Sequence, residues 1–182
     1  RAQTQVKRAW FPAGVDSLVG GGTTSGVMTT SVEARIVLAI DLGGTKAAFA
    51  VVDSEGAVLS HVKRPSHEGG TVLSFDALAT AATDAVRAAG LAWPDLRGVG
   101  VVVPGIYNPA SGRAWAPNLW GRDEVPLLGE LRPRLPARVV IDSDRSGCVL
   151  GEAWRGAARD ATDVVFLAVG TGIGAGILSQ GR

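Results

Sequence analysis

Short apolar runs separated by glycine-rich turns form the first regular pattern of the chain, starting near residue 34. ARIVLAID (34–41) and AAFAVVD (47–53) have the length of strands, and AVLSHVKR (57–64) alternates apolar and polar residues. LGGTK separates the first two runs, and DSEG separates the second from the third. The pattern predicts three short strands in an antiparallel meander. Because glycine leaves the first turn open, its backbone N–H groups are free to face a ligand.

A helical pattern follows, and two buried strands come after it. Residues 74–89 carry apolar side chains at helical spacing, with Ser74 as the expected N-cap and Gly90 as the stop. GVGVVV (98–103) and ARVVID (137–142) are continuous apolar runs, which are typical of buried strands. The helical stripe consists of Phe75, Leu78, Ala82, Ala85, Val86 and Ala89.

A long segment without periodicity lies between these two strands, from residue 106 to about 125, before a short helical pattern at LLGELRPRL. A loop of this length inside a compact domain is usually functional. After the second strand we expect a helix from about Asp144 to Ala158. TDVVFLAV (162–169) then predicts a last strand, which meets a second glycine-rich turn, GTGIGAG.

The two glycine-rich turns belong to an internal repeat. VLAIDLGGTKAAFAVVDSEG and FLAVGTGIGAGILSQG share the order of strand, turn containing Gly and Thr, strand and closing Gly turn. The repeat predicts an α/β fold of two similar lobes that face each other across a cleft. We expect residues 31–160 to form a complete first lobe, residues 161–182 to begin the second, and residues 1–30 to be an extension outside the fold. Three explanations of the extension stay open: upstream sequence translated in frame, a natural disordered arm, and a weak transit-like segment.

Composition and charge narrow the class of protein. The 182 residues have room for one domain and part of another, and 18 Lys plus Arg against 17 Asp plus Glu give a net charge of +1. Without a basic field, nucleic acid is not an expected partner. The single Cys148 and two separated histidines indicate neither an internal disulfide nor a zinc cluster. Since no apolar run approaches the ~20 residues of a membrane span, we expect a soluble, cytoplasmic protein.

The chemistry that the two glycine-rich turns favour is phosphate binding. Each turn ends a strand and offers backbone N–H groups and a Thr hydroxyl, so together they can hold a polyphosphate. Asp41, directly before the first turn, is placed to bind Mg²⁺. The alternative is two tight hairpins selected for twist alone. The spacing of a Walker A loop is absent, and the GxGxxA match at Gly170, Gly172 and Ala175 precedes no helical pattern, so a Rossmann site is not expected.

Four motifs in order give the chain from Met28 onward its resemblance to a known family. They are IDLGGTKAAFAVVD, VPGIYNPASGRAWAPNLW, IDSDRSGCVLGEAWRGAA and VFLAVGTGIGAGI. In these motifs the chain resembles the ROK family, which comprises bacterial sugar kinases and related repressors. The resemblance implies the actin-like ATPase (ribonuclease H-like) fold, ATP and Mg²⁺ as cofactors, and a sugar as substrate. It further implies a homo-oligomer when the protein is full length. Charge and the absence of a long apolar run had already indicated that neither nucleic acid nor a membrane is a partner.

The resemblance also assigns roles to single residues. Asp144 would be the general base, and the sugar would contact Gly105 and Asn118. Asp41 would lie near Mg²⁺, possibly bound to it through water. The two phosphate loops would be formed by Gly43, Gly44 and Thr45 in the first and by Thr171 and Gly172 at the start of the second.

Physical reasoning supports Asp144 independently, because a carboxylate between a buried strand and a helix start meets free amides and the positive end of the helix dipole. A simple N-cap role for Asp144 is compatible with this position and stays open. Asp142 is a rival carboxylate, but it precedes the helix start by two residues and matches no motif. An amide such as Asn118 suits vicinal sugar hydroxyls, with an ordinary turn residue as its alternative. Lys46 is more typical of a solvated side chain than of a phosphate ligand.

The chain departs from the family pattern at two neighbours of Asp144. Ser143 replaces the Asn that is common in the family, and Arg145 replaces a small residue, which weakens the expectation of a sugar contact there. The family's Glu-x-x-His sugar motif, Cys/His zinc cluster and adenosine-binding residues would all follow the second phosphate loop. We therefore expect the 182-residue polypeptide by itself to be inactive and prone to aggregate.

The function predicted from the sequence is ATP-dependent phosphorylation of a hexose, glucose or a close relative, with Asp144 deprotonating the sugar hydroxyl. One alternative is a sugar-responsive transcription regulator of the same family. It would need a winged helix-turn-helix, for which residues 1–34 are too short and too rich in glycine. A non-catalytic remnant of such a kinase is the other alternative.

Overall fold

The computed structural model describes residues 35–169 and 172–181, so the expected extension (1–30) and Thr171 lie outside the described part. Five strands form its main sheet, in the order β10-β6-β1-β2-β3. The expected meander is confirmed, because β1 (Ile36–Leu42) pairs antiparallel with β2 (Lys46–Val52), and β2 pairs antiparallel with β3 (Val58–Pro65). β6 (Leu96–Val103) runs parallel to β1 on its other side, and β10 (Val139–Ser143) runs parallel to β6.

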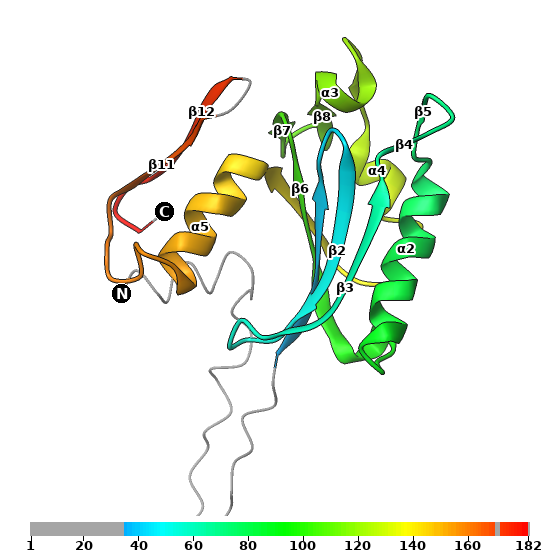
Figure 1. The fold of residues 1–182 in the computed structure, drawn as a ribbon, viewed down its shortest axis with the longest axis horizontal. Helices are drawn as coiled ribbons and strands as arrows, with labels where there is room; N and C mark the ends of the chain where they lie inside the picture. Colours follow the sequence, from blue (N-terminus) through cyan, green and yellow to red (C-terminus); the bar gives the residue numbers. More distant parts are fainter. Residues whose placement is uncertain (1–34, 170–171, 182) are drawn as a thin grey trace, which may run out of the picture.

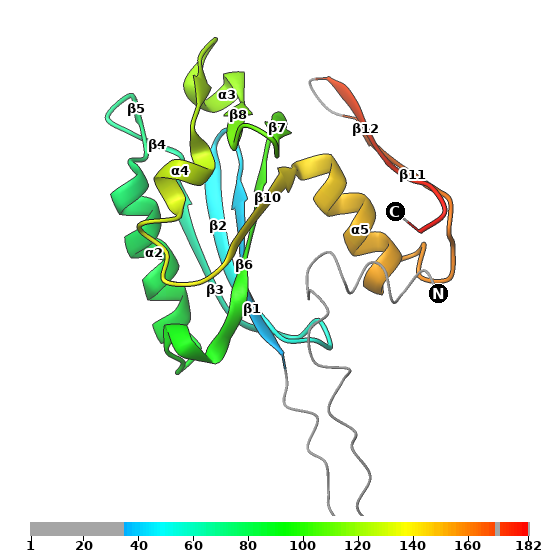
Figure 2. The same ribbon diagram turned by 180° about the vertical axis from the view of Figure 1, so that it is seen from behind.

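Alternation along β1 and β2 decides which face of this sheet carries the main core. Helices α2 (Phe75–Ala88) and α4 (Leu127–Leu131) cover that face, whereas α5 (Asp144–Arg155) lies on the other side (Figures 1 and 2). A fully buried large apolar side chain contributes roughly 1.5–3 kcal/mol, so this face holds the domain together. The side chains of β1 and β2 that point to it are each at most 3% exposed: Leu38, Ile40, Leu42, Ala47, Phe49 and Val51.

Helix α2 forms where the apolar stripe predicts it, between an N-cap and a glycine stop. The Ser74 hydroxyl accepts a hydrogen bond from the Ala77 N–H at 3.2 Å, which caps the first turn. Gly90, with φ of +73°, takes the left-handed conformation that ends the helix. The buried stripe consists of Leu78, Ala81, Ala82, Ala85 and Val86.

The segment expected to be irregular, residues 106–125, contains a small three-stranded sheet instead. β7 (Ile106–Asn108), β8 (Arg113–Trp115) and β9 (Glu124–Val125) pair antiparallel in that order, and helix α3 (Pro117–Trp120) lies between β8 and β9 along the chain. Strands of two or three residues are too short to show alternation, so no pattern in the sequence revealed them.

The second glycine-rich segment joins two strands, as the first one does. β11 (Val164–Val169) and β12 (Ile173–Leu178) form an antiparallel hairpin, so the residues after GTG are a strand and the expected absence of a Rossmann helix is confirmed. The hairpin packs on α5, where Val149, Ala153 and Leu178 form a small core of their own. α5 ends at Arg155, three residues before the predicted Ala158, and Gly156 follows in an extended conformation.

The remaining elements are short. β4 (His67–Glu68) and β5 (Thr71–Val72) form a two-stranded ribbon, and Trp93–Asp95 form a single 3₁₀ turn (η1) before β6. A cavity of about 160 Å³ remains between α5 and the sheet, lined on the sheet side by Val37, Ala39 and Val52. In the described part of the chain, no helix has both the length and the apolar character needed to cross a membrane.

Candidate functional site

Three of the predicted site residues lie at the carboxyl ends of the parallel strands, which meet at one edge of the main sheet. Asp41 is near the end of β1, Gly105 follows β6, and Asp144 follows β10. Asp41 and Asp142 both pair in register with Val102 of the intervening strand, so their backbones lie about 10 Å apart, twice the strand spacing. The β1–β2 turn, the start of α5 and helix α3 all lie toward this edge, at the top of Figure 1.

The first glycine turn is too tight for a side chain at its first position. The Gly43 N–H donates to the Lys46 carbonyl at 3.1 Å, and a Cβ on Gly43 would lie 2.7 Å from that same oxygen. The turn therefore requires glycine at this position. Thr45 and Lys46 are exposed at its far side, so the hydroxyl and the ammonium group face solvent rather than the core.

Ser66 braces this turn, and the sequence analysis did not single it out. Its hydroxyl donates to the Gly43 carbonyl at 2.6 Å and its backbone N–H donates to the Thr45 carbonyl at 2.9 Å, while the residue is only 3% exposed. The register between Lys46 and Pro65 places the residue after Pro65 opposite the turn. Strand pairing, which a single sequence does not fix residue by residue, was the information needed to find Ser66.

Gly44 and Asn118 come together although 74 residues separate them in the chain. A Cβ built on Gly44 would lie 3.1 Å from the Cβ of Asn118, which is tighter than ordinary van der Waals contact. Asn118 is exposed on α3, directly beside the turn. The predicted phosphate turn and a predicted sugar-contacting residue are therefore immediate neighbours.

Gly105 is buried where the chain passes behind β8. A Cβ at this position would collide with the Trp115 carbonyl oxygen and would lie 2.9 Å from the Cα of Ala116. Gly105 is therefore a close-packing residue whose absent side chain lets β8 approach. Since β8 leads into α3, this contact sets the position of Asn118 as well.

Asp144 is the first residue of α5, and Ser143 is the N-cap. The Ser143 hydroxyl accepts from the Ser146 N–H at 3.1 Å, so the N-cap alternative for Asp144 is wrong. One Asp144 oxygen, Oδ1, accepts from the Arg145 N–H at 2.8 Å. The carboxylate thus lies at the start of a twelve-residue helix, beside the positive end of the helix dipole.

Asp41 and Asp144 interact electrostatically across this edge of the sheet. Burial of the carboxyl group raises the pKa of Asp41 above its ordinary value of 3.8, and the negative charge of Asp144 raises that pKa further. Asp41 as a whole residue is exposed, but the protein atoms around its carboxyl group are close enough to raise its pKa. Two mutually repelling carboxylates are an arrangement that a bound cation would relieve.

Asp41 is the carboxylate at this site that could bind Mg²⁺. Within residues 35–169 and 172–181, no group of three or more His, Cys, Asp or Glu side chains is arranged to hold a metal ion. Mg²⁺ usually takes one or two carboxylates and completes its shell with waters and substrate phosphates. Asp41 beside an open glycine turn fits this pattern.

The second glycine turn is only partly described. Gly172 is exposed next to β12, with open space where a side chain would be, and Thr171 is outside the described residues. The hairpin end that carries Gly172 points in the same direction as the β1–β2 turn (Figure 1). The ring of Trp120, two residues after Asn118, packs against Phe75 with ring centroids 6.4 Å apart.

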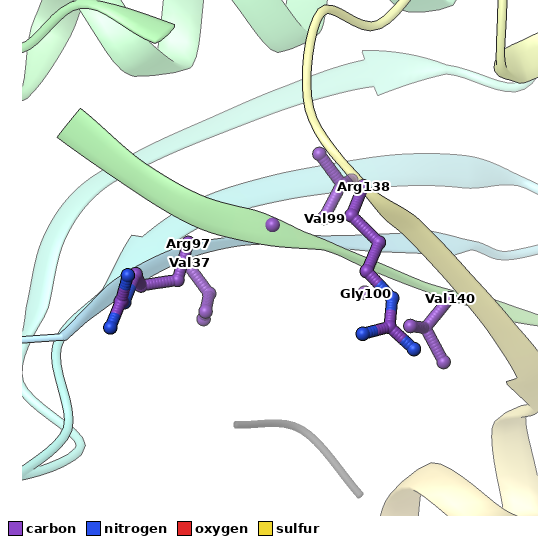
Figure 3. A pocket seen from close by; sticks show the side chains of 7 residues that line it. Val37, Arg97, Val99, Gly100, Arg138 and Val140 are labelled. Atoms are coloured by element: carbon purple, nitrogen blue, oxygen red, sulfur yellow. The ribbon is translucent and has the colours of Figure 1, made fainter. Parts of the chain in front are cut away.

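A small pocket at the other end of the sheet is separate from this site. It has a volume of about 20 Å³, and the side chains that line it include Arg97, Arg138, Val37, Val99 and Val140 (Figure 3). Arg97 is at the start of β6 and Arg138 precedes β10, so both are at the amino ends of strands whose carboxyl ends carry the candidate site.

The sheet order, the meander and the two glycine hairpins define the class of protein: an α/β domain with the actin-like ATPase fold, of which this structure covers a part. Residues 37–182 match the ROK family, and the chain belongs to this family. A ROK hexokinase from Thermus thermophilus matches with a TM-score of 0.71 and 33% identity, over 81% of this chain and 48% of that one.

Two further relatives are named as kinases of particular sugars. A ROK family glucokinase from Streptomyces griseus, solved in complex with glucose and AMPPNP, matches with a TM-score of 0.68 and 30% identity, over 81% of this chain and 45% of that one. An N-acetyl-D-glucosamine kinase from Escherichia coli is 34% identical over 143 residues, which are 78% of this chain and 46% of that protein. The chain spans less than half the length of the curated relatives it matches.

Proposed function

We propose that the protein is an ATP-dependent hexose kinase that acts on glucose or a closely related sugar. The observation that carries the proposal is the meeting of three parts at one edge of the sheet: the glycine turn, Asn118 in contact with it, and Asp144 at the start of α5. The glucokinase that binds glucose and AMPPNP supports the choice of substrates. Because an N-acetyl-D-glucosamine kinase is also among the relatives, experiment must decide whether the sugar carries a hydroxyl or an N-acetyl group at carbon 2.

In the proposed reaction, a sugar hydroxyl oxygen attacks the terminal phosphorus of ATP, the bond from that phosphorus to ADP breaks, and the hydroxyl proton passes to Asp144. The position of Asp144 in the first turn of α5, at the carboxyl edge of the sheet, supports its role as the acceptor of this proton. Asn118 and the backbone at Gly105 would orient the sugar, and the amides of Gly43, Gly44 and Thr45 would face the phosphates.

Asp41 would hold Mg²⁺, directly or through water, and Thr171 and Gly172 would contribute to the phosphate site from the second hairpin. When bound, Mg²⁺ would neutralise negative charge on the transferring phosphates. The position of Asp41 supports this assignment: burial raises the pKa of its carboxyl group, and the nearby charge of Asp144, which raises that pKa further, is one that a cation would offset.

We also propose the domain boundaries and the setting of the reaction. Residues 31–160 form the first lobe and residues 161–182 begin the second, which the separate β11–β12 sheet supports. The whole protein would work as a homo-oligomer in the cytoplasm, where ATP and the sugar are its small-molecule partners.

The test of the proposed function is an assay of ADP release by the whole product of the gene that encodes this sequence. It is supplied with ATP, Mg²⁺ and, one at a time, glucose, mannose and N-acetylglucosamine. We expect ADP release that depends on a hexose, with at least a tenfold preference for one of them. Sugar binding without ADP release for any hexose would contradict the kinase proposal and favour a sugar-responsive regulator.

A further inference from the structure

Arg145 connects three segments that lie far apart in the sequence. It is the second residue of α5 and comes directly after Asp144. Its guanidinium Nη2 donates to the Gly105 carbonyl oxygen at 2.9 Å, across 40 residues of chain. Its Cδ lies 2.8 Å from the position of a Cβ on Gly174 in β12. A single side chain therefore contacts the turn after β6, the start of α5 and the second glycine hairpin.

The bond to Gly105 matters because that residue sets the position of α3. Gly105 packs against the backbone of Trp115 and Ala116, and Ala116 is the N-cap of the helix that carries Asn118. The path from the guanidinium to Asn118 runs through close backbone contacts, not through flexible side chains. Loss of the guanidinium would free the segment that includes both predicted sugar contacts.

The same side chain lies against the proposed base. Arg145 Nε is 3.8 Å from Asp144 Oδ1, and the Arg145 N–H donates to that oxygen at 2.8 Å. The Arg145 carbonyl lies against Gly176, where a side chain would collide with it. β12 therefore has glycine at both positions that face Arg145, Gly174 and Gly176, and this leaves the space that the arginine occupies.

We propose that Arg145 is a positioning residue that anchors the sugar-binding segment, residues 104–118, to the helix start that carries Asp144. The inference rests on the proposed function, which it deepens by naming the residue that aligns the sugar hydroxyl with its base. A guanidinium suits this task, because it can donate to a carbonyl with one nitrogen while another faces a carboxylate.

The kinetic test compares Arg145→Ala, Arg145→Lys and a control, Arg155→Ala, in the whole gene product. Arg155 lies on the same helix but binds Glu55 and the Ser54 carbonyl at its far end. For Arg145→Ala we expect KM for the sugar to rise about tenfold or more, with KM for ATP changed less than about twofold. Added guanidinium should restore part of the lost affinity to Arg145→Ala, since the side chain is 35% exposed. Arg145→Lys should restore little, because the lysine ammonium group is a point charge and lacks the planar, multiple-donor geometry of a guanidinium.

A second readout separates failure of this inference from failure of the proposed function. Amide hydrogen exchange, measured without substrates, should become faster in residues 104–118 of Arg145→Ala and stay unchanged there in Arg155→Ala. If the protein phosphorylates no sugar but exchange changes as expected, the kinase proposal fails and the anchor stands. If the kinase is active and Arg145→Ala changes neither sugar KM nor exchange in this segment, the anchor is overturned.

Discussion

At the residue scale, Asp41 and Asp144 are two carboxyl groups at one edge of the sheet with different surroundings. Burial and the neighbouring charge raise the pKa of Asp41, so its ionised form is less stable in the folded protein than in the unfolded chain. Asp144 has different surroundings, since it is the first residue of α5 and its Oδ1 accepts from the Arg145 N–H. The proposed roles of the two carboxylates differ accordingly: Asp41 would bind a cation and Asp144 would accept a proton.

Asp41→Asn is expected to stabilise the protein at pH 7. The folded state holds the Asp41 proton more tightly than the unfolded state, so this residue lowers stability as pH rises from the ordinary pKa of 3.8 through the raised folded pKa. The neutral amide avoids that loss, and the gain should disappear at pH values below 3.8. Thermal unfolding measured with and without Mg²⁺ checks this, and we expect Mg²⁺ to stabilise the parent but not the variant. Asp123→Asn, at an exposed loop, is the control, and an Asp41→Asn protein less stable than this control at pH 7 would contradict the account.

The elements with a clear period are those that the sequence predicted. The three-stranded meander and α2 lie where alternation, helical spacing and the caps at Ser74 and Gly90 indicate them. The small sheet of β7, β8 and β9 was missed because its strands are two or three residues long. The contact between Gly44 and Asn118 was also out of reach, since it depends on how that small sheet folds back over the turn.

The β11–β12 hairpin has one face on α5 and an apolar face in contact with nothing else in the described structure. Val164, Phe166 and Leu178 point toward α5, and the alternate residues point away from it. Large apolar surfaces of this kind mark an interface or a liability to aggregate. The outward-facing residues are between 62% and 82% exposed: Val165, Leu167, Val169, Ile173 and Ile177.

The 182-residue polypeptide expressed by itself should therefore self-associate through this face. Val165→Thr combined with Ile177→Thr should shift it toward the monomer in size-exclusion chromatography, because the two residues are cross-strand partners on the exposed face and threonine keeps the preference for strands. Val58→Thr removes a comparably exposed valine from β3 and should leave the association unchanged. If the parent polypeptide is monomeric at every concentration tested, this face does not mediate self-association and the prediction is wrong.

At the scale of the whole molecule, the described structure contains a five-stranded sheet with its helices and a separate hairpin, β11–β12, which repeats the strand, glycine turn and strand of β1 and β2. The family match and the fold agree with the resemblance drawn from four sequence motifs. Three of these motifs surround turns at the carboxyl edge of the main sheet, and the fourth contains the separate β11–β12 hairpin. These motifs led to the prediction of Asp41, Gly43, Gly105, Asn118 and Asp144 as site residues, and their roles stay predictions. Ser66 and the contacts of Arg145 depend on strand register and on the packing of α5, which only the folded molecule supplies.

The measurement that tests the account most directly compares hexose phosphorylation by Asp144→Asn and Asp142→Asn in the whole gene product. The two residues are separated only by Ser143. Asp142 lies in strand β10, whereas Asp144 is the first residue of helix α5, at the positive end of its dipole. Loss of a general base costs ~10²- to 10⁴-fold in rate, so we expect kcat to fall by that factor in Asp144→Asn and to stay near the parent value in Asp142→Asn. If Asp144→Asn keeps more than half of the parent kcat, or if Asp142→Asn loses as much as Asp144→Asn, Asp144 is not the base and the proposed mechanism is wrong.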